Sequence, residues 1–304
     1  MTRSLEKRIA VSVTISGLER LYGKDLSGVV DTARVAEGAG IHQIALPDHL
    51  AIGPNTDAYP YGKFPLPSSE PWLEPVTTLA AIAGATRRIR LATGVLIAPL
   101  RPALLLAKSL ATLDVLSGGR VDLGVGLGWQ REEFEASGVA FEGRAARMDD
   151  TLRACRVLWS QAPASFESPS VSFRDLWCLP RPVQEGGLPI WLGVRLDERN
   201  VSRIVEYGAG WMPLGLALEE LERGTQWLRR AYEGAGRDPD SIGVRSMVPV
   251  ALDARGRVDL ERTLEAVPAL RQAGVTVAAF ALGRFVNTRD EIRPFLERLG
   301  RIDA

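Results

Sequence analysis

Three short segments that could bind or react with an organic molecule follow strand-like runs of apolar residues. They are Asp48-His49, Thr93-Gly94-Val95 and Gly126-Leu127-Gly128-Trp129. An imidazole transfers protons near neutral pH, glycines let a ligand approach the backbone closely, and a Trp or His ring offers a stacking face. If the segments meet, Thr93 and Asp48 can form hydrogen bonds to a ligand held between them. These residue types favour a site for a planar cofactor.

The elements that must position these segments alternate between strand and helix. Branched apolar residues occupy every second position in 9–15, which is the period of a β-strand. Further strand-like runs lie at 41–46, 89–95, 121–127, 189–193, 210–213, 242–250 and 275–282. Helical patterns lie near 27–39, 102–117, 148–159, 197–207, 218–234, 259–273 and 288–300. Eight strands with intervening helices in 304 residues predict a (β/α)8 TIM barrel that occupies residues 1–304 as one domain.

A doubly wound open sheet is the alternative fold. Its glycine-rich dinucleotide fingerprint should follow the first strand, and residues 15–18 do not supply it. In a TIM barrel, catalytic groups lie at the C-terminal ends of the strands. The barrel therefore brings the three segments together, whereas the open sheet leaves them without the expected fingerprint.

Two insertions interrupt the predicted barrel. Residues 50–72, after strand 2, contain five prolines, and we expect this segment to overhang the strand ends. Its Tyr59, Tyr61 and Trp72 would then shape a substrate pocket. Residues 161–188, before strand 5, contain a hairpin-like region from Phe166 to Phe173.

Composition excludes several classes of function. The 37 Lys and Arg balance the 37 Asp and Glu, so the chain lacks the basic surplus of a nucleic-acid binder. His42, His49, Cys155 and Cys178 lack metal-ligand spacing, so we expect no metal. Apolar runs are shorter than the roughly 20 residues of a membrane span. Residues 1–8 lack the apolar core of a secretory signal, and we expect a cytoplasmic protein without a membrane partner.

Longer runs of sequence resemble a known family. They are Leu-Ala-Thr-Gly-Val-Leu at 91–96, Ala-Lys-Ser-Leu-Ala-Thr-Leu-Asp-Val-Leu-Ser-Gly-Gly-Arg at 107–120, the strand and loop at 121–129, Glu-Glu-Phe at 132–134, and the segments 180–184 and 188–193. Together they resemble the luciferase-like monooxygenase superfamily, and more narrowly its branch that uses the deazaflavin coenzyme F420. The resemblance is strongest over 41–160 and weak after about residue 215.

The resemblance implies an oxidoreductase that transfers a hydride between F420 and a small organic substrate, by reducing a C=C or C=N bond or by oxidising an alcohol. It places Asp48 and His49 beside the cofactor ring as the catalytic pair. It makes Gly94-Val95 a cis-peptide bulge behind the ring, with Thr93 before it and Gly126, Gly128 and Trp129 along the cofactor. Gly193, Val194 and Arg195 match the segment that receives the cofactor phosphate. A homo-oligomer is also typical of the family.

Two departures from the family pattern affect these expectations. Many relatives have Gly-Gly where this chain has Gly193-Val194, so Arg195 would have to supply part of the phosphate contact. Trp129 stands where the sugar-phosphate dehydrogenases of the branch have a catalytic glutamate, which argues against sugar oxidation. We expect the nearby Glu132 and Glu133 to face the following helix and to take no part in proton transfer.

Two alternatives remain open at this stage. One is an FMN-dependent monooxygenase that activates dioxygen in the same pocket. The other is a non-catalytic member that retains the barrel as a cofactor-binding protein. The Asp48-His49 pair favours the deazaflavin hypothesis, on the basis of the family resemblance.

Overall fold

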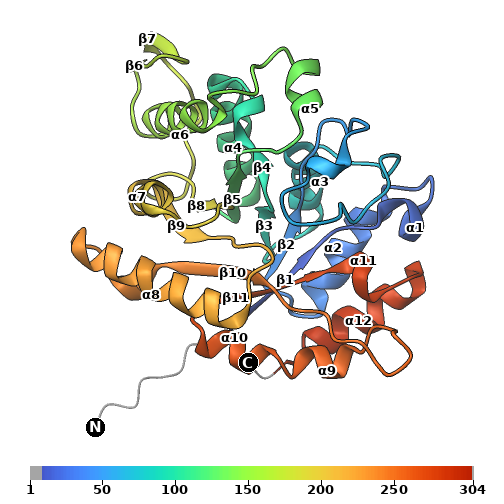
Figure 1. Ribbon diagram of the computed structural model, residues 1–304. Coiled ribbons are helices and arrows are strands. Elements are labelled where there is room, and N and C mark those ends of the chain that lie inside the picture. Colours follow the sequence, from blue (N-terminus) through green and yellow to red (C-terminus); the bar gives the residue numbers. More distant parts are fainter. Residues whose placement is uncertain (1–8, 303–304) are drawn as a thin grey trace.

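Eight parallel strands close into a barrel in the computed structural model, which describes residues 9–302 (Figure 1). In chain order they are β1 (Ala10–Thr14), β2 (Gln43–Leu46), β3 (Arg90–Thr93), β5 (Val121–Gly126), β8 (Ile190–Leu192), β9 (Gly208–Trp211), β10 (Gly243–Met247) and β11 (Val277–Ala281). Each pairs with the next, and β11 pairs with β1. The short β4 (Leu96–Ile97) follows β3 and also pairs with β5. The predicted (β/α)8 barrel is confirmed.

Helices surround the barrel on its outside (Figure 1). They are α1 (Leu18–Tyr22), α2 (Gly28–Gly38), α3 (Pro75–Ala85), α4 (Ala103–Ser117), α5 (Arg131–Ala136), α6 (Arg144–Ser160), α7 (Glu198–Tyr207), α8 (Leu218–Gly234), α9 (Leu260–Leu264), α10 (Val267–Gln272), α11 (Leu282–Phe285) and α12 (Ile292–Leu299). Short 3-10 turns are η1 (Thr56–Ala58), η2 (Ala98–Leu100), η3 (Pro239–Ser241) and η4 (Arg289–Glu291). The predicted helix 259–273 is two helices, and Pro268, which lacks an amide hydrogen, lies in the first turn of the second.

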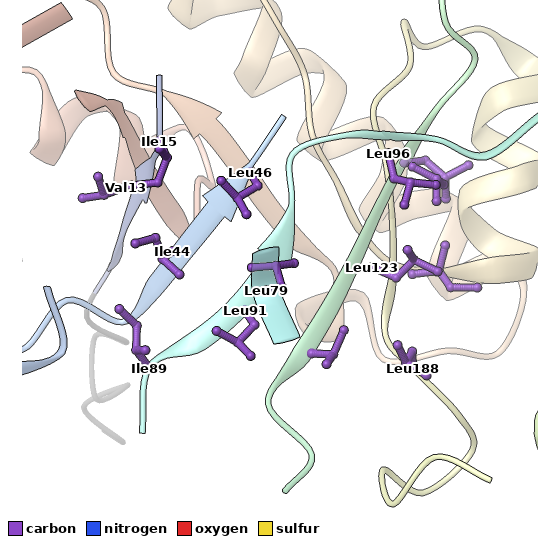
Figure 2. Close-up of a cluster of buried hydrophobic side chains, with 14 of the residues drawn as sticks. Val13, Ile15, Ile44, Leu46, Leu79, Ile89, Leu91, Leu96, Leu123 and Leu188 are labelled. Atoms are coloured by element: carbon purple, nitrogen blue, oxygen red, sulfur yellow. The ribbon is translucent and has the colours of Figure 1, made fainter. Parts of the chain in front are cut away.

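The hydrophobic core lies between the barrel and its helices. Ile44, Leu91 and Leu123 point outward from successive strands and are fully buried. Leu79 of α3 packs in the same cluster (Figure 2). Burial of strands beneath helices is typical of parallel sheets and explains their nearly continuous apolar sequences.

The barrel interior, in contrast, holds a network of polar side chains. The Arg90 guanidinium donates to both carboxylate oxygens of Asp122, at 2.8 and 2.6 Å. Arg245 donates to the side chains of Gln43 at 3.1 Å and Thr14 at 2.7 Å. Burial lowers the pKa of Arg245 to about 10, so this guanidinium is charged at neutral pH. Because its buried members are hydrogen-bonded, the network gives the strand ends above it a rigid support.

Both predicted insertions are present. The segment between β2 and α3 contains η1, and β6 (Ala164–Glu167) pairs antiparallel with β7 (Ser172–Leu176) as a hairpin before β8. Among residues 9–302, no helix combines the length and apolar character that crossing a membrane requires. Residues 1–8, on which the expectation about a secretory signal rests, lie outside the described residues.

Candidate functional site

A cavity of about 820 Å³ opens at the C-terminal ends of the barrel strands. Residues that follow β2, β3, β5 and β8 line it together with part of the 50–72 segment. Its volume lies within the roughly 300–1,000 Å³ that is typical of small-molecule sites. The structure thus brings together most of the residues singled out from the sequence: Asp48, His49, Tyr59, Tyr61, Trp72, Gly94, Val95, Gly126, Gly128, Trp129, Gly193, Val194 and Arg195.

The Gly94-Val95 segment contributes to the cavity lining and contains a cis peptide bond, as the family resemblance implies. The side chain of Val95 lies against two glycines. A Cβ atom on Gly126 would lie 2.7 Å from one Val95 methyl, and a Cβ on Gly193 would lie 2.6 Å from the other. These two glycines therefore make room for Val95, and since both line the cavity, their contact with a ligand stays a prediction.

Glu133 holds the imidazole of His49. Its Oε2 lies 3.0 Å from Nδ1 of the ring, and its Oε1 accepts a hydrogen bond from the Leu50 amide at 2.6 Å. A carboxylate can only accept, so Nδ1 carries the proton in this contact and Nε2 remains for a ligand. The expectation that Glu133 faces the following helix is wrong. Glu133 lies in the first turn of α5 yet is buried beneath the loop after β2.

The carboxylate of Asp48 forms hydrogen bonds with other groups of the protein. It accepts two hydrogen bonds from Arg101, at 2.6 and 2.9 Å, and one from the Ile97 amide at 2.8 Å. Its side chain is fully buried, and that of Arg101 is 11% exposed. Asp48 borders the cavity but serves to fix the loop before His49. Asp48 therefore has a structural role in this loop, and its part in proton transfer stays a prediction.

Thr93 is the predicted site residue that does not line the cavity. Its side chain is fully buried, and the hydroxyl donates to the Gly124 carbonyl at 2.6 Å. The hydroxyl thus joins β3 to β5 below the bulge. We expected Thr93 to form a hydrogen bond with the ligand. In the structure its hydroxyl instead forms a contact between two strands.

Aromatic side chains form one wall of the cavity. The His49 ring packs edge-on against Trp72 with centroids 4.7 Å apart and against Trp129 at 5.8 Å. Tyr59 packs edge-on against Trp129 at 5.3 Å. Phe64, which the sequence did not single out, contacts His49, Tyr59 and Trp129. Burial raises the pKa of the Tyr59 hydroxyl, so it remains a hydrogen-bond donor at neutral pH.

Arginine side chains line the cavity at two places. Arg195 is exposed, donates to the Pro60 carbonyl at 3.0 Å and lies over the Tyr61 ring at 5.4 Å. The guanidinium carbons of Arg131 and Arg144 lie 4.7 and 3.8 Å from the centre of the Phe141 ring. Sequence reasoning missed this second pair, because charged residues at 131–144 look like those of an ordinary solvated helix.

Comparisons with known proteins identify the family of this chain. The model of the luciferase-like monooxygenase family matches residues 9–290. The chain belongs to this family. An uncharacterised protein of Mycobacterium tuberculosis is 33% identical over 272 residues, which cover 88% of this chain and 90% of that relative.

Several solved structures share the fold of this chain. A monooxygenase of Streptomyces bottropensis superimposes with a TM-score of 0.78 at 21% identity, covering 96% of this chain and 98% of its own. A coenzyme F420-dependent tetrahydromethanopterin reductase of Methanopyrus kandleri gives a TM-score of 0.73 at 16% identity, with 97% and 98% covered. Both likenesses establish the fold alone.

The cavity fits the cofactors of the luciferase-like family, F420 and FMN, which join a flat ring to a phosphate-bearing chain. Val95 and the aromatic wall offer apolar surfaces to a ring. Arg195 and Arg144 offer positive charge to a phosphate, whereas Arg131 is paired with the Glu142 carboxylate at 2.6 Å. Because Arg101 neutralises Asp48, that carboxylate does not repel an anionic ligand.

Proposed function

We propose that this protein is an oxidoreductase that transfers a hydride between F420 and a small organic substrate. The substrate would be a C=C or C=N compound that is reduced, or an alcohol that is oxidised. The observation that carries this proposal is the buried Glu133–His49 pair beside the Gly94-Val95 bulge, in a chain of the luciferase-like family. The bound deazaflavin would supply the hydride chemistry.

The residues of this chain would supply position and proton transfer. Val95 would contact the ring, while Trp129 and Tyr59 of the aromatic wall would keep water away from it. In alcohol oxidation, Nε2 of His49 would accept the hydroxyl proton, and the deazaflavin would be the hydride acceptor. In reduction, the same nitrogen would return a proton to the product. Arg195 and the backbone at 193–195 would hold the cofactor phosphate, as the resemblance implies.

Binding of F420 and FMN, titrated separately and followed by protein fluorescence, tests this proposal. We expect F420 to quench the tryptophans of the cavity wall, and binding of neither cofactor would refute it. The second candidate is an FMN-dependent monooxygenase, which membership of the luciferase-like monooxygenase family supports. Oxygen uptake during turnover separates the two, because deazaflavin transfers hydride without activating dioxygen usefully.

A non-catalytic cofactor-binding protein is separated from both enzymes by His49→Ala. An enzyme loses turnover in this variant, whereas a carrier loses at most cofactor affinity. The homo-oligomer implied by the family resemblance stays a prediction, which the molar mass in solution would test.

A further inference from the structure

A second cavity, of about 910 Å³, lies beside the candidate catalytic cavity. Pro60, Tyr61, Arg195 and Leu214 line both of them. One face of helix α8 lines the second cavity and does not line the catalytic cavity. The hydrogen bond from Arg195 to the Pro60 carbonyl therefore marks the boundary, and a ligand that extends past it from the catalytic cavity enters the second one.

The second cavity carries an excess of positive charge. Arg195, Arg223 and Arg230 line it, and Glu220 is its one carboxylate among the described residues. Glu220 Oε2 accepts a hydrogen bond from the Ala217 amide at the start of α8, at 2.8 Å. The chain as a whole has no net charge, so this excess is local.

The arginines of the cavity also differ from Arg229, a neighbouring arginine of α8. Arg229 pairs with Asp240 at 3.4 Å on another face of α8. Arg195, Arg223 and Arg230 form no ion pair with any residue between 9 and 302. Three guanidinium groups around one cavity are thus left to bind an anion.

The cavity also has an apolar side. Trp227 is half-buried, and Leu214 and Leu216 stand beside it in the lining. A simple inorganic ion would leave this surface uncovered, whereas a carbon chain with anionic groups would contact both kinds of surface.

We propose that the second cavity binds the anionic extension of a ligand whose reactive end occupies the catalytic cavity. Carboxylate or phosphate groups of this extension contact the three arginines, and its carbon atoms pack against Trp227. The inference rests on the proposed function, which places the reactive end beside His49. The extension belongs either to the acidic chain of the cofactor or to an anionic substrate.

Three fluorescent probes distinguish these sources. They are F420 with its glutamate chain, the deazaflavin riboside that lacks both phosphate and chain, and 8-anilinonaphthalene-1-sulfonate as an amphiphilic organic anion. The variant is Arg223→Ala/Arg230→Ala, in which both altered side chains are exposed and outside the core. The control is Arg229→Ala, which removes one positive charge from another face of α8 and should bind all probes as the wild type does.

The expected result is a selective loss of anion affinity. If the cofactor chain occupies the cavity, the dissociation constant for F420 rises at least tenfold in the double variant and that of the riboside stays constant. If an anionic substrate occupies it, both deazaflavins bind unchanged and the anilinonaphthalene sulfonate weakens at least tenfold. Unchanged binding of all three probes overturns the proposal, as does an equal loss in Arg229→Ala. The wild type could also bind the sulfonate, with weaker binding in the double variant, and yet bind neither F420 nor FMN. That result would contradict the proposed function and leave the anion site standing.

Discussion

Nδ1 of His49 lies 3.0 Å from Oε2 of Glu133, although 84 residues separate them in the chain. The imidazole is held on a second side by the edge of Trp72. Glu133 also binds the Leu50 amide, so one carboxylate fixes both the ring and the backbone that carries it. This arrangement leaves Nε2 as the nitrogen that can act on a ligand, and it makes Glu133 a positioning residue.

Replacing Glu133 with glutamine tests this role. The new amide would donate to Nδ1 and move the ring proton to Nε2, which converts the proposed acceptor into a donor. We expect kcat for alcohol oxidation to fall about 100-fold, while KM and cofactor affinity change little. Glu132→Gln, which alters a neighbour that also lines the cavity, is the control and should retain turnover. Equal kinetics in the wild type and Glu133→Gln would contradict the assignment.

A methyl group at Gly126 should displace the bulge. The added Cβ would lie 2.7 Å from a Val95 methyl, well inside van der Waals contact. We expect Gly126→Ala to cost about 1–3 kcal/mol in the free energy of unfolding and to weaken cofactor binding. Val95→Ala removes the opposing methyls, so the double variant should recover part of both losses. Urea unfolding and cofactor titration measure the effect, and strictly additive losses would disprove the contact.

The pair between Asp48 and Arg101 should dominate the stability of the loop after β2. Arg101→Ala leaves a buried carboxylate without its partner, which costs about 3–5 kcal/mol. The exposed pair of Arg34 and Asp31 provides a comparison, and Arg34→Ala should cost less than about 1 kcal/mol. Both values follow from denaturant unfolding. A similar cost for the two variants would show that burial of the Asp48 pair contributes nothing.

Glu74 should make stability depend on pH in the acid range. Burial acts to raise the pKa of Glu74, but hydrogen bonds from Thr77 and Arg101 outweigh it and lower the pKa below 4.5. The unfolded state therefore binds more protons just below pH 4.5, and the stabilisation present above that pH is lost as the pH falls through the folded value. Glu74→Gln should be less stable than the wild type at pH 7, with a difference that shrinks below pH 4.5. A constant difference from pH 7 to pH 3 would exclude this linkage.

The barrel itself was predictable because its elements follow local rules. Alternating apolar residues and intervening helical patterns mark the eight strands, and strand ends in such a barrel must meet at one rim. Helix α3 was missed for a physical reason: residues 75–85 are apolar on nearly all sides, so they lack a helical period. The family resemblance, rather than periodicity, supplied the cis bulge at Gly94-Val95.

The sequence by itself determined the barrel, its two insertions and the meeting of His49, Gly94-Val95 and Trp129 at one cavity. Only the tertiary structure decided which side chains are free to act there. Asp48 and Thr93 have side chains that could bind a ligand, but they form hydrogen bonds with Arg101 and with the Gly124 carbonyl. Glu133, which follows another strand, forms the contact with His49. Hydrogen-bond partners distant in sequence leave no local pattern, because they depend on how loops from different strands pack against one another.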